Sequence, residues 1–179
     1  VNVDANVGAT IANALTSTGG SVGLVKLGDG TLTLTGASTY TGATTVQAGT
    51  LAIAAGGSIT SSVTNAATFT NAGSVAGSLT NSGTASNTGT VNGGLTNTAG
   101  TTNNGGTIYG VVTILAGTLS TSAATSVVNG GLINSGTVNA RGQINGSVAN
   151  NAGAVFTVVG GLTGIGRSPG RFEFGKLEN

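Results

Sequence analysis

Three short runs of alternating apolar and polar residues lie close together in the N-terminal third of the chain. They cover residues 31–35, 44–47 and 51–53, and the glycines Gly36, Gly42 and Gly49 punctuate them. Strict alternation over a few residues is typical of a β-strand with one buried face. Strands this short, with turns this regular, are too small for a large open sheet. The pattern instead predicts a chain that turns a corner every few residues and stacks each coil on the one before it.

A second repeat runs through the C-terminal half, with the order aliphatic, any, Gly, any, aliphatic, any, often Asn, any, Gly. Its copies begin at Val75, Val91, Ile108, Val128 and Ile144, which are 16, 17, 20 and 16 residues apart. Two aliphatic positions four apart would also suit a helix, but each glycine costs a helix about 1 kcal/mol relative to alanine. The repeat therefore favours a strand-and-turn unit. Coils of about twenty residues would wind this chain roughly eight or nine times.

The two patterns together predict which side chains face the interior of the coils. The predicted inward residues are Leu32, Leu34, Val46, Leu51, Ile53, Leu79, Leu95, Leu132 and Val148. One position of the second repeat is often asparagine, at Asn81, Asn97, Asn134 and Asn150. Asparagine tolerates left-handed backbone at corners, and stacked asparagines form hydrogen-bonded ladders. We expect such a ladder here, with an interruption in the copy that carries Ile114.

One segment resembles a known protein family. Leu27-Gly28-Asp29-Gly30-Thr31-Leu32-Thr33-Leu34-Thr35-Gly36 is followed by Thr39-Tyr40-Thr41-Gly42, Thr44-Thr45-Val46 and Ala48-Gly49-Thr50-Leu51. This spelling, between Val22 and Ile53, resembles the passenger-associated transport repeat of bacterial autotransporters. The resemblance implies an all-β protein, a right-handed parallel β-helix (β-solenoid), on a passenger that is secreted or displayed at the bacterial cell surface. The positions that carry it are interpreted as structural, with Tyr40 packing at a corner: Gly28, Gly30, Leu32, Leu34, Gly36, Tyr40, Gly42, Val46, Gly49 and Leu51.

Composition fits a thin solenoid better than a disordered chain. Charged residues make up 5% of the chain and hydrophobic residues 38%, with a net charge of +1, whereas disorder usually combines low hydrophobicity with high net charge. Glycine supplies 34 of 179 residues and aromatic residues only 3%, which suits tight corners and a narrow interior. The absence of cysteine excludes a disulfide framework and thiol chemistry, and it is compatible with export through an oxidising compartment.

We expect residues 1–166 to form the β-helix and residues 167–179 to form a separate tail. The tail, RSPGRFEFGKLEN, holds five of the nine charged residues and the only proline. It is interpreted as a cap, a linker or a segment added during cloning. Since the N-terminus shows no basic region followed by an apolar stretch, we expect a piece of a longer precursor, without its signal peptide and its outer-membrane barrel.

Side chains suited to catalysis are scarce. Histidine, the commonest general base and metal ligand, is absent. The segment around Ser21, Gly-Gly-Ser-Val-Gly, matches the spelling of a nucleophile elbow, but Ser21 then lacks its triad partner. Asp4 and Asp29 lie about one coil apart and could stack, although Asp29 sits between two glycines as turn residues often do. We therefore predict no enzymatic activity, no cofactor and no metal.

The basic residues outside the tail are Lys26 and Arg141, and both are interpreted as solvated surface groups. A nucleic-acid site needs a basic stripe, usually with stacking aromatics, so no nucleic-acid partner is expected. Tyr109 falls on a variable position of the second repeat and is expected to face outward.

Three classes of function follow. The favoured one is a non-enzymatic, adhesive stalk of an autotransporter passenger, whose partners would be copies of itself, a host-cell or matrix surface, and the outer-membrane barrel of its own precursor. The second is an ice-binding β-solenoid, which needs Thr-x-Thr in coil after coil. Thr31-Leu32-Thr33 supplies one copy, but elsewhere, as at Thr68-Phe69-Thr70, the motif shows no common step. The third is a polysaccharide-active β-helix enzyme, which the fold permits although fold does not fix function. Since the residues to carry such activity are missing here, the chain would then be the inert stem of a β-helix protein whose effector or enzyme domain lies elsewhere.

Overall fold

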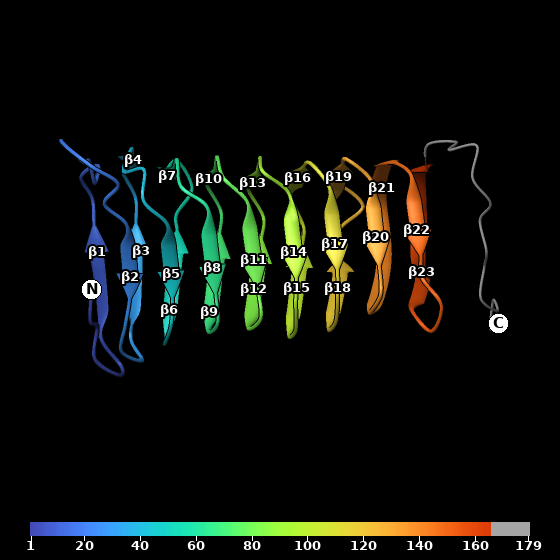
Figure 1. The fold of residues 1–179 in the computed structure, drawn as a ribbon, viewed down its shortest axis with the longest axis horizontal. Helices are drawn as coiled ribbons and strands as arrows, with labels where there is room; N and C mark the ends of the chain where they lie inside the picture. Colours follow the sequence, from blue (N-terminus) through green and yellow to red (C-terminus); the bar gives the residue numbers. More distant parts are fainter. Residues whose placement is uncertain (166–179) are drawn as a thin grey trace.

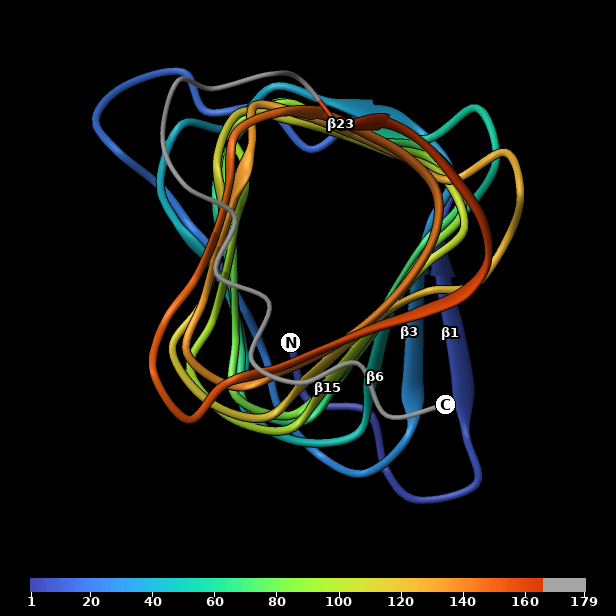
Figure 2. The same ribbon diagram turned by 90° about the vertical axis from the view of Figure 1, so that its right-hand side faces the viewer.

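The computed structural model describes residues 1–165, which form a row of stacked coils made of β-strands and turns (Figure 1). Each complete coil has three sides, and each side is a ladder of parallel strands. The expected tail, residues 167–179, lies outside the described residues. Within them there is no helix long and apolar enough to cross a membrane. Viewed along the row, the coils superimpose around a common interior (Figure 2).

We call the three ladders the first, second and third faces. The first face contains β1 (Gly8–Ile11), β3 (Thr31–Leu34), β6 (Thr50–Ile53), β9 (Thr68–Asn71), β12 (Thr84–Asn87), β15 (Thr101–Asn104), β18 (Thr118–Thr121), the start of β21 (Thr137–Gly146) and β23 (Val155–Ile165). The second face contains β2 (Leu24–Lys26), β5 (Thr44–Val46), β8 (Val63–Asn65), β11 (Leu79–Asn81), β14 (Leu95–Asn97), β17 (Val112–Ile114), β20 (Leu132–Asn134) and β22 (Val148–Asn150). The third face contains β4 (Ala37–Ser38), β7 (Ser58–Ile59), β10 (Ser74–Val75), β13 (Thr90–Val91), β16 (Thr107–Tyr109), β19 (Val127–Asn129) and the ends of β21 and β23.

The second repeat of the sequence corresponds to the length of a coil. Its five starting residues pair with one another in order on the third face, from Val75 with Val91 to Val128 with Ile144. The two aliphatic positions four apart lie on different strands. Val75 ends β10 and Leu79 begins β11, with a corner between them. The four-residue spacing that would also suit a helix therefore separates two inward residues, one on each side of a corner.

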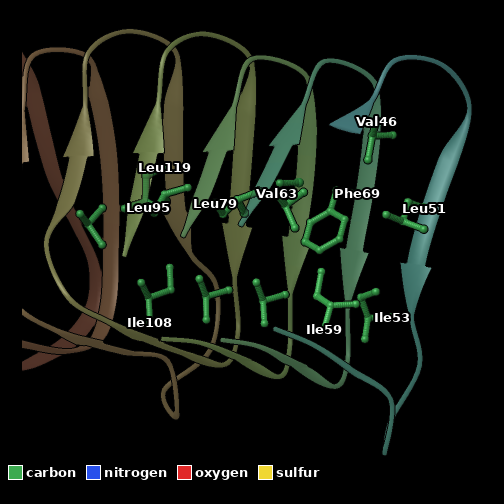
Figure 3. Close-up of a cluster of buried hydrophobic side chains, with 14 of the residues drawn as sticks. Val46, Leu51, Ile53, Ile59, Val63, Phe69, Leu79, Leu95, Ile108 and Leu119 are labelled. Carbon is green, nitrogen blue, oxygen red and sulfur yellow. The ribbon is translucent and has the colours of Figure 1, made fainter. Parts of the chain in front are cut away.

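The interior is a set of side-chain columns that run along the row of coils (Figure 3). Of the nine residues predicted to face inward, eight are buried and Val148 is partly buried. Each column takes one residue from each coil, so large and small side chains must balance along it. On the first face, for example, Leu51, Phe69 and Ala85 are consecutive partners. The core is thus thin and long, as the low aromatic content predicted.

Glycines let neighbouring coils approach closely at the corners. Gly57, Gly73, Gly89 and Gly106 stack at one corner, and a Cβ on Gly89 would overlap the carbonyl oxygen of Gly73. That contact is with backbone, which cannot move aside as a flexible side chain would.

We expect Gly89→Ala to destabilise the protein by about 1–3 kcal/mol, because the added methyl group forces two coils apart. Gly8→Ala is the matched control, since a Cβ there meets nothing within 4 Å, and it should be neutral or slightly stabilising. Urea denaturation measures both. Equal midpoints for the two variants would show that the corner contact does not limit the spacing of the coils.

Candidate functional site

The family-motif residues occupy the coils from β2 to β6. Leu32, Leu34, Val46 and Leu51 are each at most 1% exposed. The motif glycines lie at corners where a Cβ would overlap backbone of the neighbouring coil: Gly28, Gly30, Gly36, Gly42 and Gly49. Gly28 and Gly49 also have positive φ angles, 72° and 61°, which side chains disfavour. These residues are placed to build a coil, and none presents a reactive group.

Tyr40 is buried at a corner between the third and second faces. Hydrogen bonds join its Oη to Thr44 Oγ1 at 2.6 Å and Thr44 Oγ1 to Ser61 Oγ at 2.7 Å. Thr60 Oγ1 also donates to the Tyr40 carbonyl oxygen. The phenol therefore fixes the corner through a buried chain of hydroxyl groups, as buried tyrosines usually do.

The predicted asparagine ladder exists on the second face. Asn65 Nδ2 donates to Asn81 Oδ1 at 2.7 Å, and Asn81 Nδ2 donates to Asn97 Oδ1 at 2.8 Å. Ile114 interrupts the ladder, which resumes where Asn134 Nδ2 donates to Asn150 Oδ1. The expected left-handed backbone is wrong for these residues. Among residues 1–165 the one non-glycine residue with positive φ is Asn6, and the ladder asparagines are strand residues with inward side chains.

A second asparagine ladder, on the first face, was not predicted. Asn71 Nδ2 donates to Asn87 Oδ1 at 2.8 Å, and Asn87 Nδ2 donates to Asn104 Oδ1 at 2.7 Å. Every amide in it points toward the next coil. Asn71 Oδ1 accepts no hydrogen bond from the described residues, because Ile53 occupies its position in the preceding coil. The regular sequence spacing of Asn71, Asn87 and Asn104 is the feature from which this ladder could have been predicted.

Lys26 corrects the prediction of a solvated surface cation. Its side chain is 0% exposed. The ammonium donates to the carbonyl oxygens of Leu27, Gly28 and Ala48, at 2.8, 2.6 and 3.2 Å. Lys26 stands in the same column as Asn65, with Val46 between them. It therefore serves corner carbonyl groups of two coils, as the asparagine amides do further along the column.

Burial lowers the pKa of the Lys26 ammonium below its ordinary value, and the charge of Asp29 acts in the opposite direction. The unfolded chain then binds more protons than the folded chain in the pH range between the folded and the unfolded pKa. We expect the contribution of Lys26 to the free energy of unfolding to increase as pH rises toward about 10.4. Urea midpoints of the protein and of Lys26→Met across this range separate the effect of Lys26 from that of the other groups. A difference between them that does not change with pH would contradict the prediction.

Of the residues considered for catalysis, Asp4 and Asp29 lie on neighbouring coils, since Gly30 N donates to the Val3 carbonyl oxygen. Ser21 is exposed in the segment before β2. Asp29 lines an open hollow with Asn6 and Thr31, but Asp4 is not part of that lining. The described residues contain no group of three His, Cys, Asp or Glu side chains placed to hold a metal ion. Arg141 and Tyr109 are exposed, as predicted, and Tyr109 is 47% exposed.

Outward threonines form a continuous column on the first face, although Thr-x-Thr itself occurs there only at Thr31 and Thr68. The first outward position of the strand is threonine in seven consecutive coils: Thr31, Thr50, Thr68, Thr84, Thr101, Thr118 and Thr137. Coil length varies along this column, so the sequence spacing of the threonines varies too. The second outward position is less uniform: Thr33, Ala52, Thr70, Ser86, Asn103, Ser120 and Asn139. We call these two positions the threonine column and the flanking column.

Residues 24–53 match the family described as passenger-associated-transport-repeat. This segment covers β2 to β6, the coils built by the family-motif residues described above. No curated protein and no solved structure matches the chain. The repeat and the β-solenoid fold fit a stalk of an autotransporter passenger, and this family suggests a secreted or surface-exposed protein.

Proposed function

We propose that this chain is a non-enzymatic stalk section of an autotransporter passenger, displayed on the bacterial surface or secreted, where its sides mediate adhesion and self-association. The observation that carries the proposal is the continuity of the coils. The matched repeat occupies residues 24–53, and the ladder it begins on the second face continues through eight strands to β22. A stack of coils, each contacting only its neighbours, is suited to spanning distance.

The composition of the sides supports contact rather than catalysis. The chain has no histidine and no cysteine, so the exposed Ser21 has no imidazole to activate it. The outward positions of the strands are mostly threonine, serine and asparagine. Their hydroxyl and amide groups donate and accept hydrogen bonds without charge. Surfaces of this kind can contact another copy of the chain or a host-cell or matrix surface through many weak bonds.

Self-association is expected to depend weakly on salt, because the contacting sides carry few charges for ions to screen. Sedimentation velocity of the purified chain at increasing concentration, in low and in high salt, measures this. The proposal expects larger species at high concentration in both buffers. A monomer at every concentration would contradict the self-association.

Surface display tests the proposal as a whole. The chain would be produced in a Gram-negative host between a signal peptide and an outer-membrane barrel, with the barrel alone as control. We expect added protease to reach the chain on intact cells, and we expect the cells to clump or to bind host cells or matrix. Display without clumping or binding would favour the inert stem of a longer protein. A chain that stays inaccessible to protease would count against export.

A further inference from the structure

We propose that the first face of the solenoid is an ice-binding surface, whose ligand is the ordered water lattice at an ice crystal. This function goes beyond that of a stalk and is independent of it. It rests on one threonine per coil rather than on Thr-x-Thr in every coil. The threonine column places a threonine at the same position of seven consecutive coils, and the flanking column carries threonine, serine, asparagine or alanine.

The geometry of the first face matches a ligand that repeats in two dimensions. Neighbouring strands lie about 4.8 Å apart, and alternate residues of one strand lie about 6.6 Å apart. The threonine column and the flanking column therefore form a grid, and the six steps from Thr31 to Thr137 span about 29 Å. The coils stack in a straight row (Figure 1), so the grid continues from each coil to the next. Water molecules on an ice surface repeat at closely similar spacings, so each further coil would add the same contact.

Threonine has the chemistry that such a contact needs. Its hydroxyl donates and accepts hydrogen bonds, and its methyl group orders water without competing for those bonds. The β-branched side chain is stiff about χ1, so hydroxyl groups along the column can share one orientation. No charged residue occupies an outward position of β3, β6, β9, β12, β15 or β18. A charge would impose its own hydration shell on the neighbouring water.

Strand propensity alone does not account for the threonine column. Valine, isoleucine and tyrosine are as well suited to exposed strand positions as threonine, yet none of them occurs in this column between Thr31 and Thr137. The other two faces are less uniform. On the second face the threonines end at Thr113 and the next coil carries the exposed Ile133. On the third face the equivalent positions include Ala37, Ser58 and Val127.

The test compares one bulky substitution on two faces. Thr84→Tyr lies at the middle of the threonine column, and Thr80→Tyr lies at the middle of the threonine run on the second face. Tyrosine favours strands, so both variants should fold, which circular dichroism melting checks. Thr84→Lys and Thr80→Lys repeat the comparison with a second side chain. The readouts are thermal hysteresis and the fraction of protein taken up by slowly growing ice.

We expect the unmodified chain and the Thr80 variants to enter ice and the Thr84 variants to lose this uptake. Exclusion of the unmodified chain from ice would overturn the proposal. Equal uptake by Thr80 and Thr84 variants would overturn the assignment to this face. Binding to cellulose or chitin particles that Thr84→Tyr abolishes, without any uptake into ice, would show that the face binds extended polysaccharide chains instead.

Discussion

Asn81→Asp is expected to lower the free energy of unfolding by about 3–5 kcal/mol at neutral pH, because it replaces the Nδ2 donor by a buried carboxylate oxygen that faces acceptors. The amide of Asn65 still donates to the other side-chain oxygen. Asn81 Nδ2 lies within hydrogen-bond distance of four oxygens, those of Gly83, Asn97, Thr101 and Thr102. An ionised aspartate accepts hydrogen bonds only, so the carbonyl oxygens of Gly83, Asn97 and Thr101 would face a negative charge. Since small proteins are stable by about 5–15 kcal/mol, this loss would remove a large part of the stability.

The pH dependence of this variant has a defined sign. Burial among acceptors raises the pKa of a carboxyl group above its unfolded value of about 3.9. The variant should therefore regain stability as pH falls toward that value and lose it as pH rises through the folded pKa. Asn103→Asp is the control, because Asn103 is exposed on the outward side of β15. It should change stability by less than about 0.5 kcal/mol. Urea midpoints that are equal for both variants at neutral pH would show that the ladder does not stabilise the stack.

Phe69→Ala is expected to cost about 3–5 kcal/mol of the free energy of unfolding, since it creates a cavity in the core. The ring is 0% exposed and lies in one column between Leu51 and Ala85. Ala85 is too small to fill the space, so two consecutive coils would lack a large side chain there. Thr70→Ala, at the outward neighbour on the same strand, should cost far less. Urea denaturation compares the two.

A second substitution tests whether volume along the column is what matters. Combining Phe69→Ala with Ala85→Phe moves the ring by one coil and restores the total volume. Cores tolerate such exchanges better than net loss of volume, so the double variant should recover part of the lost stability. A double variant that is less stable than Phe69→Ala would show that the ring is fitted to its own coil alone.

The spacing of the sequence repeat predicted the length of the coils, because the same requirement sets both. An inward residue must recur once per coil, so the steps from Val75 to Ile144 are the coil lengths themselves. The same reasoning predicted the ladder at Asn81 and its interruption at Ile114. Both inferences needed only that successive copies be aligned.

Features that depend on contacts across coils of unequal length were not predictable in this way. The threonine column is not evident in the sequence, because the corners between its strands differ in length and the spacing of the threonines therefore varies. Lys26 was placed at the surface because lysine is rarely buried without a partner. Its partners are carbonyl oxygens of two coils, and the residues around Lys26 in the sequence do not predict these contacts. β1, whose sequence is GATI, follows neither repeat, yet it pairs with β3 and extends the first face.

Distances between spin labels along the threonine column show whether successive coils stack in register into one straight solenoid. The chain has no cysteine, so cysteines introduced in pairs would carry the only labels. Thr31 would be paired in turn with Thr101, Thr118 and Thr137, and pulsed electron paramagnetic resonance would give the three distances. The account predicts separations that increase by about 4.8 Å per coil, from about 19 to about 24 to about 29 Å. Distances that fail to increase in equal steps would contradict the register on which the fold, the stalk and the ice-binding face all depend.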